Sequence, residues 1–321
     1  MNRRDTVLAM LALGAAPSTL LAQKRTVRIG ALGPRKNSVL LPHALKRLAE
    51  LGYVEDRNLE LIYRSADGQL ERFPALAREL IDAKCDLIFA VGAEAAGRAL
   101  VDAKSLIPVV LLALDYDPVR ACLVSSLRRP GGLVTGVVGE TLALSAKRIE
   151  VMREILPKVN RFLVLSDNFT KSQLEFSIEA ARLLRVELVI ESFGAPPYDF
   201  EAAFTKGRSA QAGALIVLTS PVFQDQIDKI FDFAIKHRLP ASSGSDSYGD
   251  RGILFFYGAK VDKHIARAGD IAASILGGKA PGDIPIELPT DIRLTINLKT
   301  AKALDITVPK SMLVRADRVI E

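Results

Sequence analysis

Short apolar runs alternate with stretches of helical periodicity along the first part of the chain. The pattern predicts β-strands at 26–33, 59–66, 87–92 and 107–115, with helices at 41–51, 71–83 and 94–104 between them. Parallel strands need long crossover connections, and helices of this length supply them. We therefore predict a parallel sheet that carries helices on both faces.

The same alternation returns in the second part of the chain. It predicts strands at 160–168, 186–193, 212–221 and 251–260, with helices at 172–184, 199–209, 223–237, 261–276 and 298–304. The two parts meet at the glycine-rich segment 128–142, whose composition suits a turn and a crossover strand. The fold class we predict is α/β, with two doubly wound parallel-sheet lobes and a ligand cleft between them.

The carboxyl ends of the predicted strands carry the candidate binding residues, because open parallel sheets bind ligands outside those ends. In the first lobe the candidates are Gly33, Gly92, Ala93, Glu94, Asp115 and Tyr116. In the second lobe they are Asp167, Asn168, Phe169, Ser220, Pro221, Asp246 and Tyr248. We expect these residues to line one cleft where the two lobes face each other.

The acids at the strand ends have more than one possible role. Asp117 precedes Pro118, which is the signature of a helix cap, and we expect it to start the next helix. Asp115 has no such role and is expected to face the cleft. Glu94 lies in the first turn of its helix, where the helix dipole also favours an acid. A general acid and base pair stays open as an alternative.

Familiar catalytic patterns are absent from the chain. It has no G-x-S-x-G, no G-x-G-x-x-G after the first strand and no phosphate-binding Gly-Lys-Ser/Thr loop. Its three histidines fall in predicted helices without partners at metal-ligand spacing. We therefore predict no catalytic residue, no metal site and no cofactor. The net charge is +6, but the lysines and arginines are scattered among acidic residues and form no basic run. This distribution argues against a nucleic-acid partner.

The N-terminus has the layout of an export signal. Arg3 and Arg4 precede an apolar run at 7–16, and small residues lead to Ala22. The run is too short to span a bilayer. We expect residues 1–22 to be a signal peptide that is removed near Ala22, which places the protein in the periplasm. The paired arginines leave the Sec and twin-arginine routes both open.

The two cysteines are expected to be separate, buried thiols. Cys85 opens one predicted strand, and Cys122 lies beyond the end of the next. A six-residue strand covers about 20 Å. A disulfide cannot span that distance.

Several longer segments resemble one protein family. They are 48–68, 72–92, 125–137, 146–165 and 296–321, and they include Arg-Pro-Gly-Gly-Leu-Val-Thr-Gly-Val and Asn-Leu-Lys-Thr-Ala-Lys-Ala-Leu. In order and spacing they resemble the ABC-transporter substrate-binding proteins, which have a type I periplasmic-binding fold. The resemblance extends over essentially all of the chain after the predicted signal peptide.

The resemblance implies a receptor whose chain crosses three times between two lobes. Lobe one would comprise 24–139 and 256–287, and lobe two 140–255 and 288–321. A small-molecule ligand would bind between them, and the partner would be an ABC permease in the inner membrane. We expect a monomer that needs no cofactor and catalyses no reaction.

Two departures from the family pattern bear on the ligand. Gly-Thr-Pro-Ala-Ala of the family is replaced by Gly-Ala-Glu-Ala-Ala at 92–96, and Tyr116 stands where a glycine is common. We therefore expect an amino acid, or an aromatic or cationic solute with an apolar body. A sensor that presents its ligand to a membrane receptor and an exported α/β enzyme are the alternative functions.

Overall fold

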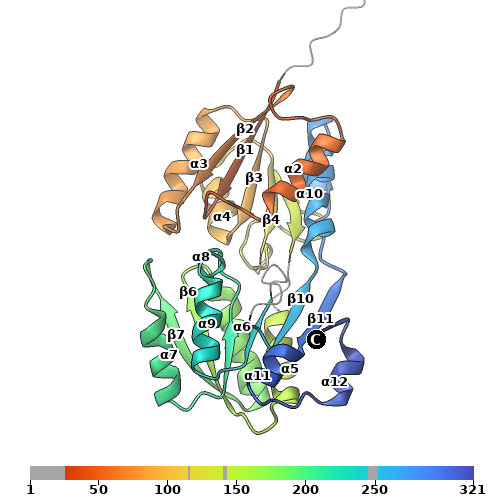
Figure 1. The fold of residues 1–321 in the computed structure, drawn as a ribbon. Helices are drawn as coiled ribbons and strands as arrows, with labels where there is room; N and C mark the ends of the chain where they lie inside the picture. Colours follow the sequence, from red (N-terminus) through yellow and green to blue (C-terminus); the bar gives the residue numbers. More distant parts are fainter. Residues whose placement is uncertain (1–25, 115, 140–142, 245–251) are drawn as a thin grey trace, which may run out of the picture.

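The computed structural model describes residues 26–114, 116–139, 143–244 and 252–321. Its strands form two separate sheets, each at the centre of a lobe (Figure 1). The first sheet is parallel and has the order β2-β1-β3-β4-β5. Its strands are β1 (Val27–Gly33), β2 (Leu59–Ser65), β3 (Leu87–Gly92), β4 (Val109–Ala113) and β5 (Val134–Val138).

Helices cover both faces of this first sheet. On one side lie α3 (Phe73–Asp82) and α4 (Glu94–Asp102), and on the other α2 (Leu41–Glu50) and α10 (Val261–Leu276). Because both faces are covered, β3, β4 and β5 are buried along their whole length, which explains the continuous apolar sequences of β3 and β4. We call this sheet with its helices lobe one.

The second sheet has the order β12-β11-β10-β9-β8-β6-β7. Its strands are β6 (Arg161–Asp167), β7 (Glu187–Phe193), β8 (Ala214–Val217), β9 (Ala241–Ser243), β10 (Phe255–Ala259), β11 (Ile292–Asn297) and β12 (Arg318–Ile320). β10 and β11 run antiparallel, and the other pairs are parallel. The fold class predicted from the alternating pattern is therefore confirmed, with one antiparallel pair that the pattern did not indicate.

Helices cover both faces of the second sheet too, and together they form lobe two. One face packs against α5 (Ala143–Ile155), α6 (Lys171–Leu184), α11 (Leu298–Ala303) and α12 (Lys310–Arg315). The other packs against α7 (Phe200–Ser209), α8 (Pro221–Asp225) and α9 (Ile227–Lys236). The single helix predicted at 223–237 is wrong, because Gln226 leaves helical dihedrals and separates α8 from α9.

Three crossing segments connect the lobes, and they are hydrogen-bonded to one another. Val138 N donates to the Glu287 carbonyl (2.9 Å), which joins the first crossing to the third on the lobe one side. Lys260 N donates to the Asp291 carbonyl (2.8 Å), which joins the second to the third on the lobe two side. Residues 256–259 pair within the second sheet, whereas the resemblance placed them in lobe one.

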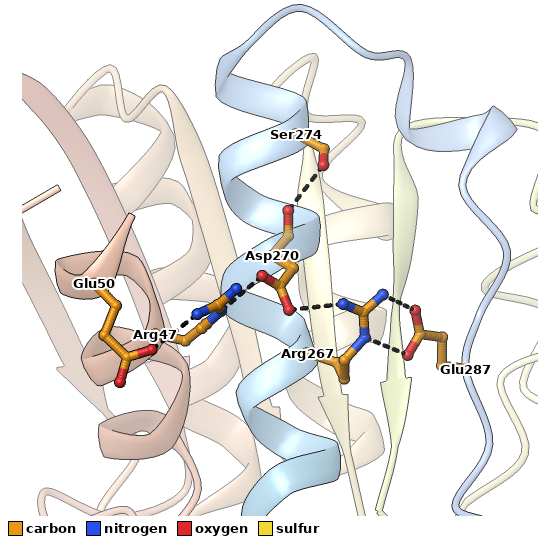
Figure 2. A network of polar contacts seen from close by, with 6 residues as sticks. All are labelled: Arg47, Glu50, Arg267, Asp270, Ser274 and Glu287. Carbon is orange, nitrogen blue, oxygen red and sulfur yellow. Dashed lines mark hydrogen bonds and ion pairs between the residues drawn. The ribbon is translucent and has the colours of Figure 1, made fainter. Parts of the chain in front are cut away.

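An ion-pair network holds α10 between α2 and the third crossing (Figure 2). Arg267 binds both carboxylate oxygens of Glu287, and it also donates to Asp270 on its own helix. Asp270 accepts from Arg47 of α2, which in turn binds Glu50. The network fixes the start of the third crossing to the helical layer of lobe one.

The thiols differ from the expectation in one respect. Both cysteines are free and Cys85 is buried, but Cys122 is exposed. The reason is local: Pro118–Cys122 form a turn instead of the predicted helix, and Cys122 has a positive φ of 53°. Its neighbours Ala121 and Leu123 are buried in the core of lobe one, whereas the Cys122 side chain faces solvent. None of the helices in the described part of the chain could span a membrane, and the predicted signal peptide lies outside the described residues.

A substitution at Gly136 tests the packing of β5. Its φ is +144°, and a Cβ at this position would lie 2.2 Å from the Leu111 carbonyl oxygen of β4. Gly136→Ala should therefore lower the free energy of unfolding by about 3 kcal/mol in urea titrations. Gly132→Ala is the control, because a Cβ there meets nothing within 4 Å. Equal stability of the two variants would contradict the strand pairing described.

Candidate functional site

A cavity of about 250 Å³ lies between the two lobes. Its lining residues are Leu70, Ala93, Glu94, Ala95, Arg98, Tyr116, Asn168, Phe169, Lys171 and Ser172. Five of them, Ala93, Glu94, Tyr116, Asn168 and Phe169, are strand-end residues that the sequence predicted as binding residues. Segments from both sheets therefore come together at one cavity.

Two helices begin at this cavity, one from each lobe. After β3, Gly92 has a positive φ of 74°, which turns the chain sharply into α4 with Ala93 as its N-cap. After β6, Asn168–Thr170 lead into α6, which begins at Lys171. Neither helix has a side chain that caps its N-terminus. The positive ends of both helix dipoles therefore face the space between the lobes.

Of the charged side chains that line the cavity, two form an ion pair with each other and the third does not take part in it. Glu94 accepts from Arg98 (2.9 Å), one turn later in α4, and Arg98 also donates to the Ala121 carbonyl. Lys171 is exposed, and no ion pair of it is found among the described residues. The cavity thus has a neutralised acid on one side and an unneutralised cation at a helix N-terminus on the other.

Two aromatic residues, Phe169 and Tyr116, line the cavity. Phe169 follows β6 of lobe two, yet it packs against the buried cores of both lobes. Tyr116 is 3% exposed, and its hydroxyl has no hydrogen-bond partner among the described residues. Burial, reinforced by the negative charge of Glu94, raises the pKa of Tyr116, so the phenol stays neutral.

Other predicted residues support the strand ends and do not line the cavity. Asp167 is buried and accepts from Phe169 N (2.9 Å), from the Tyr198 hydroxyl (3.2 Å) and from the Ser220 hydroxyl. Desolvation raises the pKa of Asp167 although these hydrogen bonds oppose the shift. Ser220 in turn caps α8 by accepting from Val222 N (3.0 Å).

The remaining candidates divide into two groups. Gly33, Gly92 and Pro221 lie at the ends of β1 and β3 and at the start of α8, outside this cavity. Asp115, Asp246 and Tyr248 lie outside the described residues. Asp117 accepts from Val119 N (2.8 Å) and Arg120 N (3.2 Å), so it caps a turn and not a helix.

Half of the lining residues were missed by the strand-end rule. They are Leu70, Ala95, Arg98, Lys171 and Ser172. Four of these, all except Leu70, lie within the first five residues of α4 and α6, just after the predicted strand ends. Extending the rule through the first five residues of each following helix would have found these four, because both helices begin at the same edge of the sheet as the strand ends.

Comparison with protein-family models identifies the chain. The model described as ABC transporter substrate binding protein matches residues 43–320. The chain belongs to the ABC transporter substrate binding protein family. The resemblance noted in the sequence is therefore confirmed.

Individual relatives agree with this assignment. A tyrosine-binding protein of Clostridioides difficile is 27% identical over 267 residues, which cover 81% of this chain and 75% of the relative. A conserved domain protein of Vibrio cholerae has a TM-score of 0.82 and 25% identity, with 92% of this chain and all of that chain covered.

A further structure shows the same fold. It is an ABC domain from Streptococcus pneumonia in complex with L-Trp, with a TM-score of 0.78 and 23% identity over 92% of this chain and 100% of that chain. Across the described residues, no three His, Cys, Asp or Glu side chains come together as a metal site.

The Tyr116 hydroxyl gives a direct test of the cavity wall. Tyr116→Phe removes a buried hydroxyl that has no partner in the described part of the chain, so it should raise the free energy of unfolding of the solute-free protein by about 1 kcal/mol. Tyr198→Phe is the matched control: its hydroxyl donates to Asp167, and its loss should destabilise by about 1 kcal/mol. Urea unfolding measures both, and destabilisation by Tyr116→Phe would contradict the unpartnered hydroxyl.

Asp167 should make stability depend on pH in a specific direction. Its folded pKa is raised, so its contribution is complete below the unfolded value, about 4, and is lost as pH rises through the folded value. The difference in unfolding free energy between the wild type and Asp167→Asn should therefore fall from pH 4 towards pH 7. Asp199→Asn, which removes an exposed capping carboxylate, should not reproduce this decline. A difference that rises with pH would contradict the raised pKa.

Proposed function

We propose that the protein is exported to the periplasm, where it captures an amino acid with an aromatic or apolar side chain between its lobes and delivers it to an ABC permease. The cavity between the lobes carries the proposal. It combines two uncapped helix N-termini, a cation without an ion pair in the described residues, and aromatic walls. Membership of the substrate-binding family supports a binding role and a permease as partner.

The volume of the cavity suits a solute of amino-acid size. An apolar cavity of about 150 Å³ can hold benzene. Pockets for drug-sized ligands are larger, about 300 to 1,000 Å³. At about 250 Å³ the cavity has room for an aromatic ring with a short polar group attached.

The distribution of charge suits a zwitterion. A carboxylate would lie near Lys171 and the N-terminus of α6, where the dipole and the side chain are both positive. An ammonium group would be directed towards Glu94, whose pairing with Arg98 is partly exposed to solvent. Phe169, Leu70 and the ring of Tyr116 would contact the apolar body.

The curated relative points to the same class of solute. That protein is described as binding tyrosine, and this chain is 27% identical to it. Lys171 disfavours polyamines, because a second cation in the cavity would be repelled. We therefore favour amino acids over the purely cationic solutes that the sequence alone left open.

A solute panel tests the proposal. L-Tyrosine, L-phenylalanine and L-tryptophan should raise the melting temperature and give saturable heats in calorimetry, because each supplies both charges and an apolar body. Tyramine, which lacks the carboxylate, and spermidine should bind at least tenfold more weakly. Stabilisation by plain anions alone, or by none of these solutes, would refute the proposal.

Lys171→Met should weaken binding of the preferred amino acid about tenfold, because a charge-assisted contact to its carboxylate is lost. Lys158→Met is the matched control, since Lys158 is exposed in lobe two and does not line the cavity. Unchanged affinity of the Lys171 variant would place the carboxylate elsewhere.

A further inference from the structure

Arg35 reaches from lobe one into lobe two. It lies in the loop between β1 and α2, and its Nη1 donates to the Pro221 carbonyl at the start of α8 (2.6 Å). Its Nη2 forms an ion pair with Asp225, at the end of the same helix. The Arg35 side chain is 17% exposed and that of Asp225 is 55% exposed, so the guanidinium is largely buried while its carboxylate partner is open to solvent.

The lobe one side of this contact is held in place by Tyr63. The Tyr63 hydroxyl donates to the Arg35 carbonyl, which fixes the backbone of the loop. Gly33 makes this possible, because a Cβ at that position would lie 2.4 Å from the Tyr63 hydroxyl oxygen. Desolvation raises the pKa of Tyr63 to about 12, so the phenol remains a donor at neutral pH.

The lobe two side is held by a second chain of hydrogen bonds. Asp167, at the end of β6, accepts from the Ser220 hydroxyl. The same hydroxyl oxygen accepts from Val222 N (3.0 Å) and Phe223 N (3.3 Å), which caps α8. The short helix α8 lies at the edge of lobe two that faces lobe one (Figure 1). Its first and last residues, Pro221 and Asp225, are the ones that Arg35 contacts.

The contact is separate from the solute cavity. Arg35 and Asp225 line a second space between the lobes, of about 330 Å³, together with residues such as Lys36, Asp67 and Gln226. The two spaces share no lining residue. A solute held in the 250 Å³ cavity would therefore not touch Arg35.

We infer that Arg35, Pro221 and Asp225 form an interlobe latch, and that Arg35 is a positioning residue that holds the lobes closed over the bound solute. The inference rests on the proposed function only in placing the solute between the lobes. A charge-assisted contact made in the closed state alone shifts the equilibrium towards closure. The latch therefore slows release of the solute, and it explains why Gly33, Asp167, Ser220 and Pro221 stand at strand ends without lining the cavity.

The test compares Arg35→Gln with Arg28→Gln. Arg28 also binds a carboxylate and a backbone carbonyl, those of Glu60 and Ala83, but both partners lie in lobe one. Arg35→Gln should increase the dissociation rate of the amino acid about tenfold in stopped-flow measurements, with little change in the association rate. Arg28→Gln should leave both rates unchanged.

A measurement without solute separates the latch from the proposed function. In small-angle X-ray scattering of the solute-free proteins, Arg35→Gln should have a larger radius of gyration than the wild type and Arg28→Gln. Arg35→Glu should behave like Arg35→Gln, and adding Asp225→Lys should restore the compact form. If no solute binds, these comparisons still test the latch.

Two results would overturn the inference. One is an Arg35→Gln variant that keeps the wild-type radius of gyration. The other is a charge-reversed pair, Arg35→Glu with Asp225→Lys, that is no more compact than Arg35→Glu alone. If Arg35→Gln changed the melting temperature but did not increase the radius of gyration, Arg35 would have a structural role within lobe one. That result would also refute the latch.

Discussion

The hydrogen bonds among the three crossing segments are the constraint on which the rest of the structure depends. Pairing of Val138 with Glu287, and of Lys260 with Asp291, joins the crossings into one narrow connection between the sheets. The Arg267–Glu287 contact anchors this connection to α10 (Figure 2). Each lobe has its own buried cores, so the crossings join two largely separate packed units.

The edge at which parallel strands end determines what the lobes present to each other. In a parallel sheet, the loop and the helix that follow each strand begin at the same edge. α4 of lobe one and α6 of lobe two therefore begin on opposite sides of one cavity. Positive dipole ends, Lys171 and the rings of Phe169 and Tyr116 are the features on which the proposed solute, with a carboxylate and an apolar body, is based. The same edges supply the Arg35 contact, so the proposed solute recognition and the proposed latch would use neighbouring loops with separate residues.

Much of the fold could be predicted from local sequence. The apolar runs at β3, β4 and β6 mark strands buried on both faces, and the helical periodicity between them leaves few alternatives. The prediction was wrong where local signals compete with tertiary context. Asp117-Pro118 is a strong helix start, yet the chain makes only a turn there and exposes Cys122. The helix break at Gln226 was likewise missed, because no glycine or proline stands there to indicate it.

The sequence by itself determined the two α/β lobes, the family and the edge at which binding residues gather. Only the tertiary structure decided which of them share a cavity. Asp167 and Ser220 look like ligand contacts in the sequence, but their polar atoms are occupied by the cap of α8. Arg98 and Lys171 lie just beyond the predicted strand ends and were not predicted, yet they line the cavity. The physical reason is that the cavity joins segments far apart in the chain, and their meeting depends on how two separately packed lobes face each other.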